Sequence, residues 1–115
     1  MTKSEFINLA LRNIGLVTRG QTASTSDITT ATTIYEAVYE QLQEEGLVTW
    51  GVDDDVPDWA TMIMKTIVAP DLAREFNLPD SKVALHQAEY VGAFRKLLQR
   101  LNEDYQPEVI PAEYF

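Results

Sequence analysis

The chain has 115 residues, which is the size of one domain. It contains no cysteine, which excludes disulfides and thiolate chemistry, and its 9 basic and 18 acidic residues give a net charge of −9 that disfavours binding to phosphate backbones. No stretch approaches the roughly 18 apolar residues of a membrane span, so we expect no membrane-spanning helix. The chain does not open with a basic region followed by an apolar block, so we expect no signal peptide and expect synthesis in the cytoplasm.

A first helix is expected over residues 3–14. Thr2 and Glu5 stand in the spacing of a capping box, in which each side chain accepts a hydrogen bond from the backbone N–H of the other residue. Gly15 suits the left-handed backbone conformation that commonly follows a helix. The small polar residues of segment 16–27 then indicate a loop.

A second helix is expected over residues 27–45, with Ser26 or Asp27 as its N-cap and Gly46 after its end. Segment 47–50 is apolar enough to lie against the core or to pair briefly as a strand. The apolar residues that recur at helical spacing, with the tyrosines that flank them, are Ala31, Ile34, Val38, Leu42, Tyr35 and Tyr39.

A third helix is expected to begin at Pro57, because the first helical position does not use the N–H that proline lacks. Pro70 falls inside the apolar pattern, and its ring clashes with the carbonyl four residues back. We therefore expect a kink, or a split into helices 57–68 and 70–76. The residues expected to line one side of this helix are Trp59, Met62, Ile63 and Ile67.

A fourth helix is expected from Asp80, as N-cap, to about Asn102. Arg95, Lys96 and Arg100 gather in its last turns, where cations favour the helix C-terminus. The residues that follow the 3.6-residue period, and that we expect to be buried, are Ala84, Ala88, Val91, Phe94, Leu98 and Leu101.

These patterns predict an all-α protein, a four-helix bundle over residues 1–103 with an extended C-terminal arm over residues 104–115. Two prolines disfavour a helix in the arm, and five large apolar side chains disfavour a free tail. The arm either packs over its own bundle or docks on another molecule, and we favour docking. The residues assigned to partner binding are Tyr105, Pro107, Val109, Ile110, Pro111, Tyr114 and Phe115.

Residues for common catalytic and metal sites are scarce. His86 is the only histidine, so one chain cannot build a His-based triad or a two-His metal site, and we expect it at the surface or boundary of the fourth helix. The acidic run 53–55, with Asp58 nearby, lacks the glycine and distal glutamate of an EF-hand and is expected to be solvated. Trp50 and Trp59 bracket this run and are expected to fold it onto the bundle; the alternative is an exposed interface role for Trp50. We assign no catalytic residue, no cofactor and no metal ligand.

Several longer motifs occur in a distinctive order. The first helix ends in ALRNIG, which holds Leu11, Arg12 and Gly15, and the second ends near LQEEGLVTW. The proline-led third helix, VPDWATMIMKTIVAPDLAREFNLP, contains Leu72, Ala73 and Phe76. With the amphipathic helix and apolar tail that follow, nearly the whole chain resembles the head-to-tail adaptor (connector) proteins of tailed bacteriophages, which include the packaged-DNA stabilisation proteins of short-tailed phages.

The resemblance implies a structural virion protein that binds beneath the portal protein as a ring of about a dozen copies. Such a ring extends the DNA channel, contacts the passing DNA non-specifically, helps to retain it, and receives the next tail or stopper protein. The protein would lie in the host cytoplasm before assembly and in the phage neck afterwards.

Two other functions stay open. One is a non-viral helical protein-binding module that docks through its C-terminal arm. The other is a small hydrolase that uses the acidic loop, since some relatives in the short-tailed group have been credited with cell-wall hydrolase activity. A glycosidase of the usual kind needs two carboxylates across a cleft, and the sequence singles out no such pair.

Overall fold

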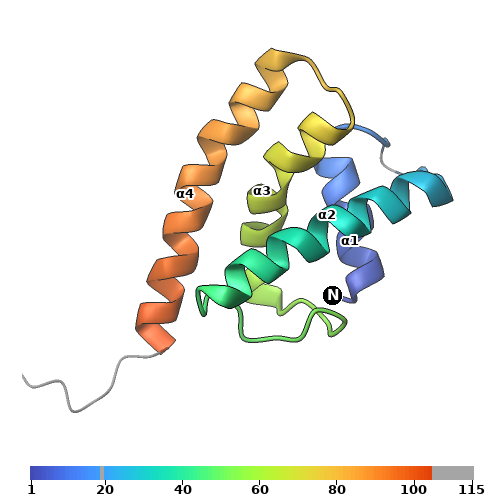
Figure 1. Cartoon of the computed structure of the whole chain (residues 1–115). Coiled ribbons are helices and arrows are strands. Elements are labelled where there is room, and N and C mark those ends of the chain that lie inside the picture. Colours follow the sequence, from blue (N-terminus) through green and yellow to red (C-terminus); the bar gives the residue numbers. More distant parts are fainter. Residues whose placement is uncertain (19, 105–115) are drawn as a thin grey trace, which may run out of the picture.

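The computed structural model describes residues 1–18 and 20–104, in which four helices and no strand occur. The helices are α1 (Lys3–Asn13), α2 (Thr25–Glu44), α3 (Asp58–Glu75) and α4 (Asp80–Asp104) (Figure 1). The predicted all-α class with four helices is confirmed. Within the described residues, no helix is at once long enough and apolar enough to cross a membrane.

The start of α1 has the predicted capping box. The Thr2 hydroxyl accepts a hydrogen bond from the Glu5 N–H at 3.1 Å, and Glu5 Oε1 accepts one from the Thr2 N–H at 2.9 Å. Gly15 has a φ of 81° and Gly46 a φ of 73°, so both occupy the left-handed region, as expected after α1 and α2. These local signals located both helix ends to within a residue or two.

The start of α2 differs from the prediction. Ser24, not Ser26 or Asp27, is the N-cap, and its hydroxyl accepts a hydrogen bond from the Asp27 N–H at 3.1 Å. The helix therefore begins at Thr25. Several neighbouring residues have side chains that can cap a helix. Ser24 is the cap because its backbone is extended and lies directly before the first turn.

Helix α3 is continuous through Pro70, so the split is wrong, and the kink expected as the other outcome stays a prediction. The helix is buried on both sides of this proline, and packing against three other helices holds it together although one backbone hydrogen bond is lost. Pro57 is the N-cap rather than the first helical residue. Met62, predicted to face the core, is 59% exposed.

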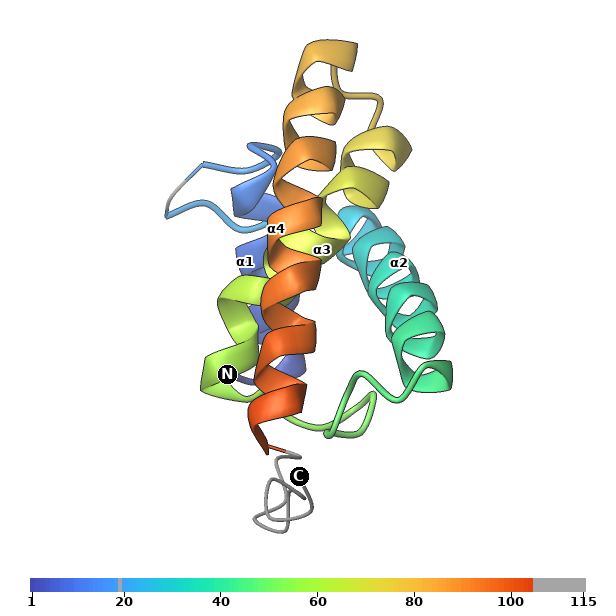
Figure 2. The ribbon, with the colours of Figure 1, turned by 90° about the vertical axis from the view of Figure 1, so that its left-hand side faces the viewer.

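Helix α3 is the centre of the fold. It packs against α1, α2 and α4, and α1 also contacts α2. The backbone of α4 approaches α3 and, within the described residues, no other helix. Figure 2 shows α4 in front of α3, with α1 on one side and α2 on the other. The bundle is thus three helices with a fourth laid along the middle one.

A chain of aromatic rings closes the lower end of the bundle and holds the 45–57 loop. Tyr35, Tyr39 and Trp50 are all buried, and the Tyr39 hydroxyl donates a hydrogen bond to the Trp50 carbonyl. Trp50 Nε1 donates to the Tyr35 hydroxyl at 3.1 Å, and Trp59 meets Trp50 edge-on at 6.0 Å. The expectation that the tryptophans fold the loop onto the bundle is confirmed, and the exposed role for Trp50 is wrong. Segment 47–50 lies against the core and is not a strand.

The buried face of α4 is not the predicted one. His86, Ala93 and Leu97 are buried against the rest of the protein, and Tyr90, Phe94 and Leu101 are half-buried. Of the residues expected to be buried, four are exposed: Ala84, Ala88, Val91 and Leu98. Helix α4 carries two apolar stripes that share Phe94 and Leu101, and the periodicity selected the one whose other members are exposed.

Candidate functional site: two surfaces that flank helix α4

The predicted partner-binding segment follows directly after α4. Helix α4 runs to Asp104, one residue into the segment assigned to the arm. Its predicted contact residues lie outside the described residues, and their role stays a prediction: Tyr105, Pro107, Val109, Ile110, Pro111, Tyr114 and Phe115.

The acidic run 53–55 is engaged by other parts of the protein. Lys3 Nζ donates to Asp53 Oδ1 at 2.7 Å and to Glu36 Oε2 at 2.6 Å, which ties the loop to α1 and α2. Partial burial lowers the pKa of Lys3, but its hydrogen bonds to Asp53 and Glu36 raise that pKa above the usual value. The Asp54 carboxylate accepts the Gly51 N–H at 3.1 Å. Over residues 1–18 and 20–104, no group of three or more His, Cys, Asp and Glu side chains could hold a metal ion.

His86 is buried, although it was expected at the surface or boundary of the fourth helix. It is 8% exposed, and its Nδ1 has no hydrogen-bond partner among the described residues, although Glu89 Oε1 lies 3.4 Å away. A lone imidazole next to one exposed carboxylate does not form a nucleophile-activating triad. We find no catalytic arrangement around it.

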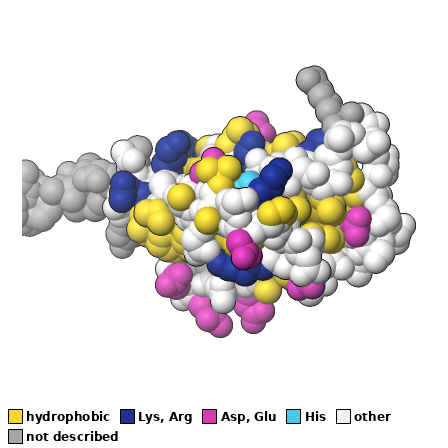
Figure 3. Space-filling model, turned by 90° about the horizontal axis from the view of Figure 1, so that it is seen from above, with side chains coloured by type: hydrophobic (Ala, Val, Ile, Leu, Met, Phe, Trp, Pro, Cys, Tyr) yellow, Lys and Arg dark blue, Asp and Glu magenta, His cyan; other side chains and the backbone are white. Residues whose placement is uncertain are grey.

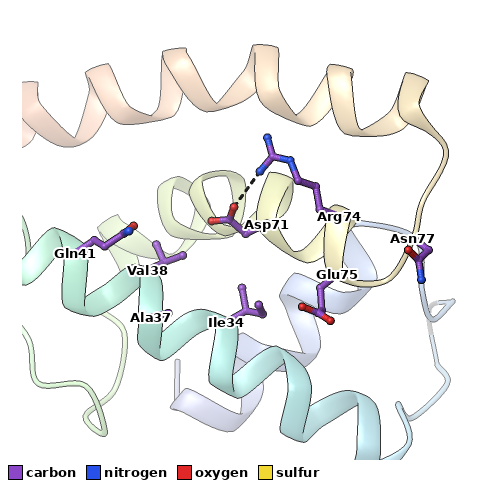
Figure 4. A pocket seen from close by; sticks show the side chains of 8 residues that line it. All are labelled: Ile34, Ala37, Val38, Gln41, Asp71, Arg74, Glu75 and Asn77. Carbon is purple, nitrogen blue, oxygen red and sulfur yellow. Dashed lines mark hydrogen bonds and ion pairs between the residues drawn. The ribbon is translucent and has the colours of Figure 1, made fainter.

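Two adjoining hollows lie on the α2 side of the α3–α4 pair, one between α2 and α3 and one between α3 and α4. Figure 4 shows the part between α2 and α3, where the side chains of Ile34 and Val38 face Asp71 and Glu75 across the hollow. This part has a volume of about 470 Å³. We call it, with its extension along α4, the acidic groove; its lining residues include Ile34, Ala37, Val38, Gln41, Asp71, Arg74 and Glu75.

The acidic groove continues along α4. A second hollow shares Asp71 and Arg74 with the first and reaches Tyr90, whose ring stacks on Phe94 at 5.8 Å. Burial raises the pKa of Tyr90, and the carboxylates of Asp71 and Glu45 raise it further. Two carboxylates, those of Asp71 and Glu75, therefore line the two hollows with one guanidinium, that of Arg74, which pairs with Asp71 at 3.1 Å.

The opposite flank of α4, on the α1 side, is basic and apolar. A hollow of about 360 Å³ lies between α3 and α4 and is lined by Met62, Lys65, Glu89 and Lys96 among others. A second hollow lies nearer the start of α4, next to the end of α1, and is lined by Arg12, Lys82, Leu85 and His86 among others. We call these two hollows and their rims the basic face.

The composition of the basic face sets it apart from the rest of the surface. Its cations are Arg12, Lys65, Lys82 and Lys96, and Glu89 is the one carboxylate among the residues that line the two hollows. It also holds the two most exposed large hydrophobic side chains of the described residues, Met62 at 59% and Leu85 at 58%. Seen from above in Figure 3, acidic side chains gather along the lower edge, which is the α2 side. The net charge of −9 is thus unevenly distributed.

Comparisons with known proteins add nothing to this geometry. No family model, no curated protein and no solved structure gives a significant match to the chain. Sequence reasoning missed both surfaces, because each combines residues from helices far apart in the chain. The available signal was the double apolar stripe of the fourth helix, since a helix with two apolar sides needs two partners.

Proposed function

We propose that this protein is a head-to-tail adaptor of a tailed bacteriophage, a structural protein rather than an enzyme. Copies of it would bind beneath the portal ring, extend the DNA channel, help to retain packaged DNA and receive the tail or stopper protein. The resemblance of the sequence suggests this role.

The observation that carries the proposal is the position of α4. Within the described residues the backbone of this helix approaches no helix but α3, and α4 keeps three large apolar side chains exposed, those of Leu85, Val91 and Leu98. Exposed apolar side chains that form a contiguous patch often mark a site of protein–protein interaction. A subunit of a closed ring needs two lateral surfaces on different sides, because each copy contacts one neighbour on each side.

The segment after α4 supplies a third contact in this proposal. Residues 105–115 hold five large apolar side chains, two prolines and no basic residue. Fully extended, these residues could span roughly 36 Å, far enough to reach a neighbouring protein. The prolines reduce the entropy that the segment loses when it binds, so a short segment can still hold a portal subunit.

Charge is consistent with a channel protein. Copies that each carry −9 would surround the DNA with carboxylates, which repel its phosphates and allow it to slide. The same charge makes free copies repel one another. A portal that binds many arms at once would raise the local concentration of copies and allow a weak lateral contact to close the ring.

The experiment is co-sedimentation with the portal protein encoded by the same genome. Two variants test the arm: truncation after Asp104, and a full-length chain with serine at all five large apolar positions of segment 105–115. Both should keep the helical circular dichroism of the parent and fail to join the portal. Normal binding by either variant would refute the docking arm, and unfolding of both would instead show that the segment packs on its own bundle.

The non-viral binding module makes a different prediction in the same experiment. Its C-terminal arm would dock on another partner, so the intact chain would not sediment with the portal at all. A full-length protein that is folded but does not bind the portal would therefore favour this second candidate.

A further inference from the structure

We propose that the acidic groove of one copy receives the basic face of a second copy, so that the chains associate head to tail through the two flanks of α4. The proposal rests on the function proposed above, because the ring supplies the second copy. Its evidence is independent of the arm: it comes from the placement, shape and charge of two described surfaces.

The two surfaces lie on opposite sides of the α3–α4 pair. The acidic groove is lined in part by α2 and the basic face in part by the end of α1, and Figure 2 shows α1 and α2 on opposite sides of α3 and α4. When two complementary surfaces face in nearly opposite directions, each added copy keeps almost the same orientation as the last. Repetition of this heterologous contact gives a ring of many copies, or an open filament if the rotation does not close.

The apolar parts of the two surfaces are complementary. Met62 and Leu85 project from the basic face, each more than half exposed. The acidic groove offers a hollow of about 470 Å³ with apolar side chains from α2, including Ile34 and Val38, on its wall. An unbranched methionine adapts to such a hollow at little steric cost, which makes Met62 the residue best suited to enter it.

The charges are complementary as well. On the basic face, Lys65 and Lys96 line the hollow beside Met62 with one carboxylate, that of Glu89. In the acidic groove, Asp71 and Glu75 line the hollow with one guanidinium, that of Arg74, so the two hollows carry net charges of opposite sign. At about 0.15 M salt the Debye length is about 8 Å, so repulsion between the net charges of whole copies is screened more than contacts across the groove. Complementary patches of this kind also select the head-to-tail arrangement, because like faces repel.

The test compares charge reversals inside and outside the two surfaces. Lys96→Glu alters the basic face, and its control Arg95→Glu makes the same charge change on the adjacent residue, which is exposed and lines neither surface. Glu75→Lys alters the acidic groove, and its control Glu40→Lys changes an exposed residue of α2 outside the groove. The chains are studied without portal, by sedimentation equilibrium up to about millimolar concentration at about 0.15 M salt.

The parent should self-associate weakly, with an average mass that rises above that of the monomer at the highest concentrations. Lys96→Glu and Glu75→Lys should each weaken association roughly tenfold, while both controls behave like the parent. An equimolar mixture of the two weakened variants should associate again, because the intact groove of one meets the intact basic face of the other.

Three results would overturn the proposal. The first is a parent that stays monomeric over the whole range, and the second is a mixture that associates no better than its components. The third is self-association that Lys96→Glu does not weaken but that truncation after Asp104 abolishes. That result would mean that residues 105–115, and not the basic face, bind in the acidic groove of the second copy. Portal binding is measured in a separate experiment. Loss of self-association would therefore refute this interface without refuting the adaptor function, and loss of portal binding would refute the adaptor function without refuting this interface.

Discussion

The packing of α4 gives the sharpest stability prediction, because two neighbouring leucines of this helix differ in burial. Leu97 is 0% exposed between α4 and the core, and Leu98 is 40% exposed on the outer side. Replacement of a fully buried leucine by alanine costs about 2–5 kcal/mol, which combines lost burial with the cavity left behind. Since the backbone of α4 approaches only α3 among the described helices, relaxation can close part of the cavity, and we expect Leu97→Ala to cost about 2–3 kcal/mol.

Leu98→Ala is the matched control, with the same chemical change one residue further along. It should cost less than about 1 kcal/mol, because much of the side chain is already in water. The assay is urea unfolding followed by circular dichroism, with thermal melting as a second readout. For a domain of about this size each kcal/mol corresponds to roughly 4–8 °C, so the two melting temperatures should differ by about 5 °C or more. Equal costs for the two variants would refute this assignment of the buried face.

Three further predictions concern the loop, the acidic run and the glycines. Tyr39→Phe should cost about 1–3 kcal/mol in urea unfolding, because it leaves the buried Trp50 carbonyl without its hydroxyl donor; a neutral result would contradict the importance of that hydrogen bond. Replacement of the aspartates 53–55 by asparagine should leave the melting temperature as insensitive to calcium and magnesium as in the parent; a calcium-dependent rise in the parent that the variant loses would contradict this. Gly92→Ala should stabilise the protein by about 0.5–1 kcal/mol, because this glycine is helical with open space around it. Gly46→Ala should destabilise it by about 1 kcal/mol, because Gly46 has a φ of 73°. A less stable Gly92→Ala variant than Gly46→Ala variant in urea unfolding would contradict this argument.

The parts of the fold that the sequence predicts well depend on neighbours in the chain. The Thr2 and Glu5 capping box and the glycines at 15 and 46 each act within one helical turn, so their spacing alone is informative. The start of α2 was placed two residues late, because hydroxyl residues from Ser24 to Ser26 are all suitable caps.

The parts that the sequence does not predict depend on tertiary contacts. Local sterics alone suggest that Pro70 breaks its helix, but burial on both sides keeps α3 continuous. Periodicity cannot decide which apolar stripe of α4 faces the core, because both stripes repeat at helical spacing. The stripe with Leu97 is buried, since it is the one that meets α3.

The candidate site also has a part that the sequence predicts and a part that only the folded structure reveals. The composition of segment 105–115 pointed to an interaction, and that prediction concerns residues beyond those described. The acidic groove and the basic face join α4 and α3 to α2 on one side and to α1 on the other. Their opposite charges could not be predicted without the arrangement of the helices, because the sequence shows only a net charge of −9.

The most direct test of the proposed adaptor function is electron microscopy of the purified protein alone and mixed with the portal protein of the same genome. The proposal predicts no rings of the protein alone at micromolar concentration, since the repulsion between copies and the loss of translational freedom, about 4–15 kcal/mol, exceed one weak lateral contact. On the portal it predicts a complete additional ring that extends the channel. A portal that stays bare, or a protein that forms abundant rings without it, would contradict the proposal.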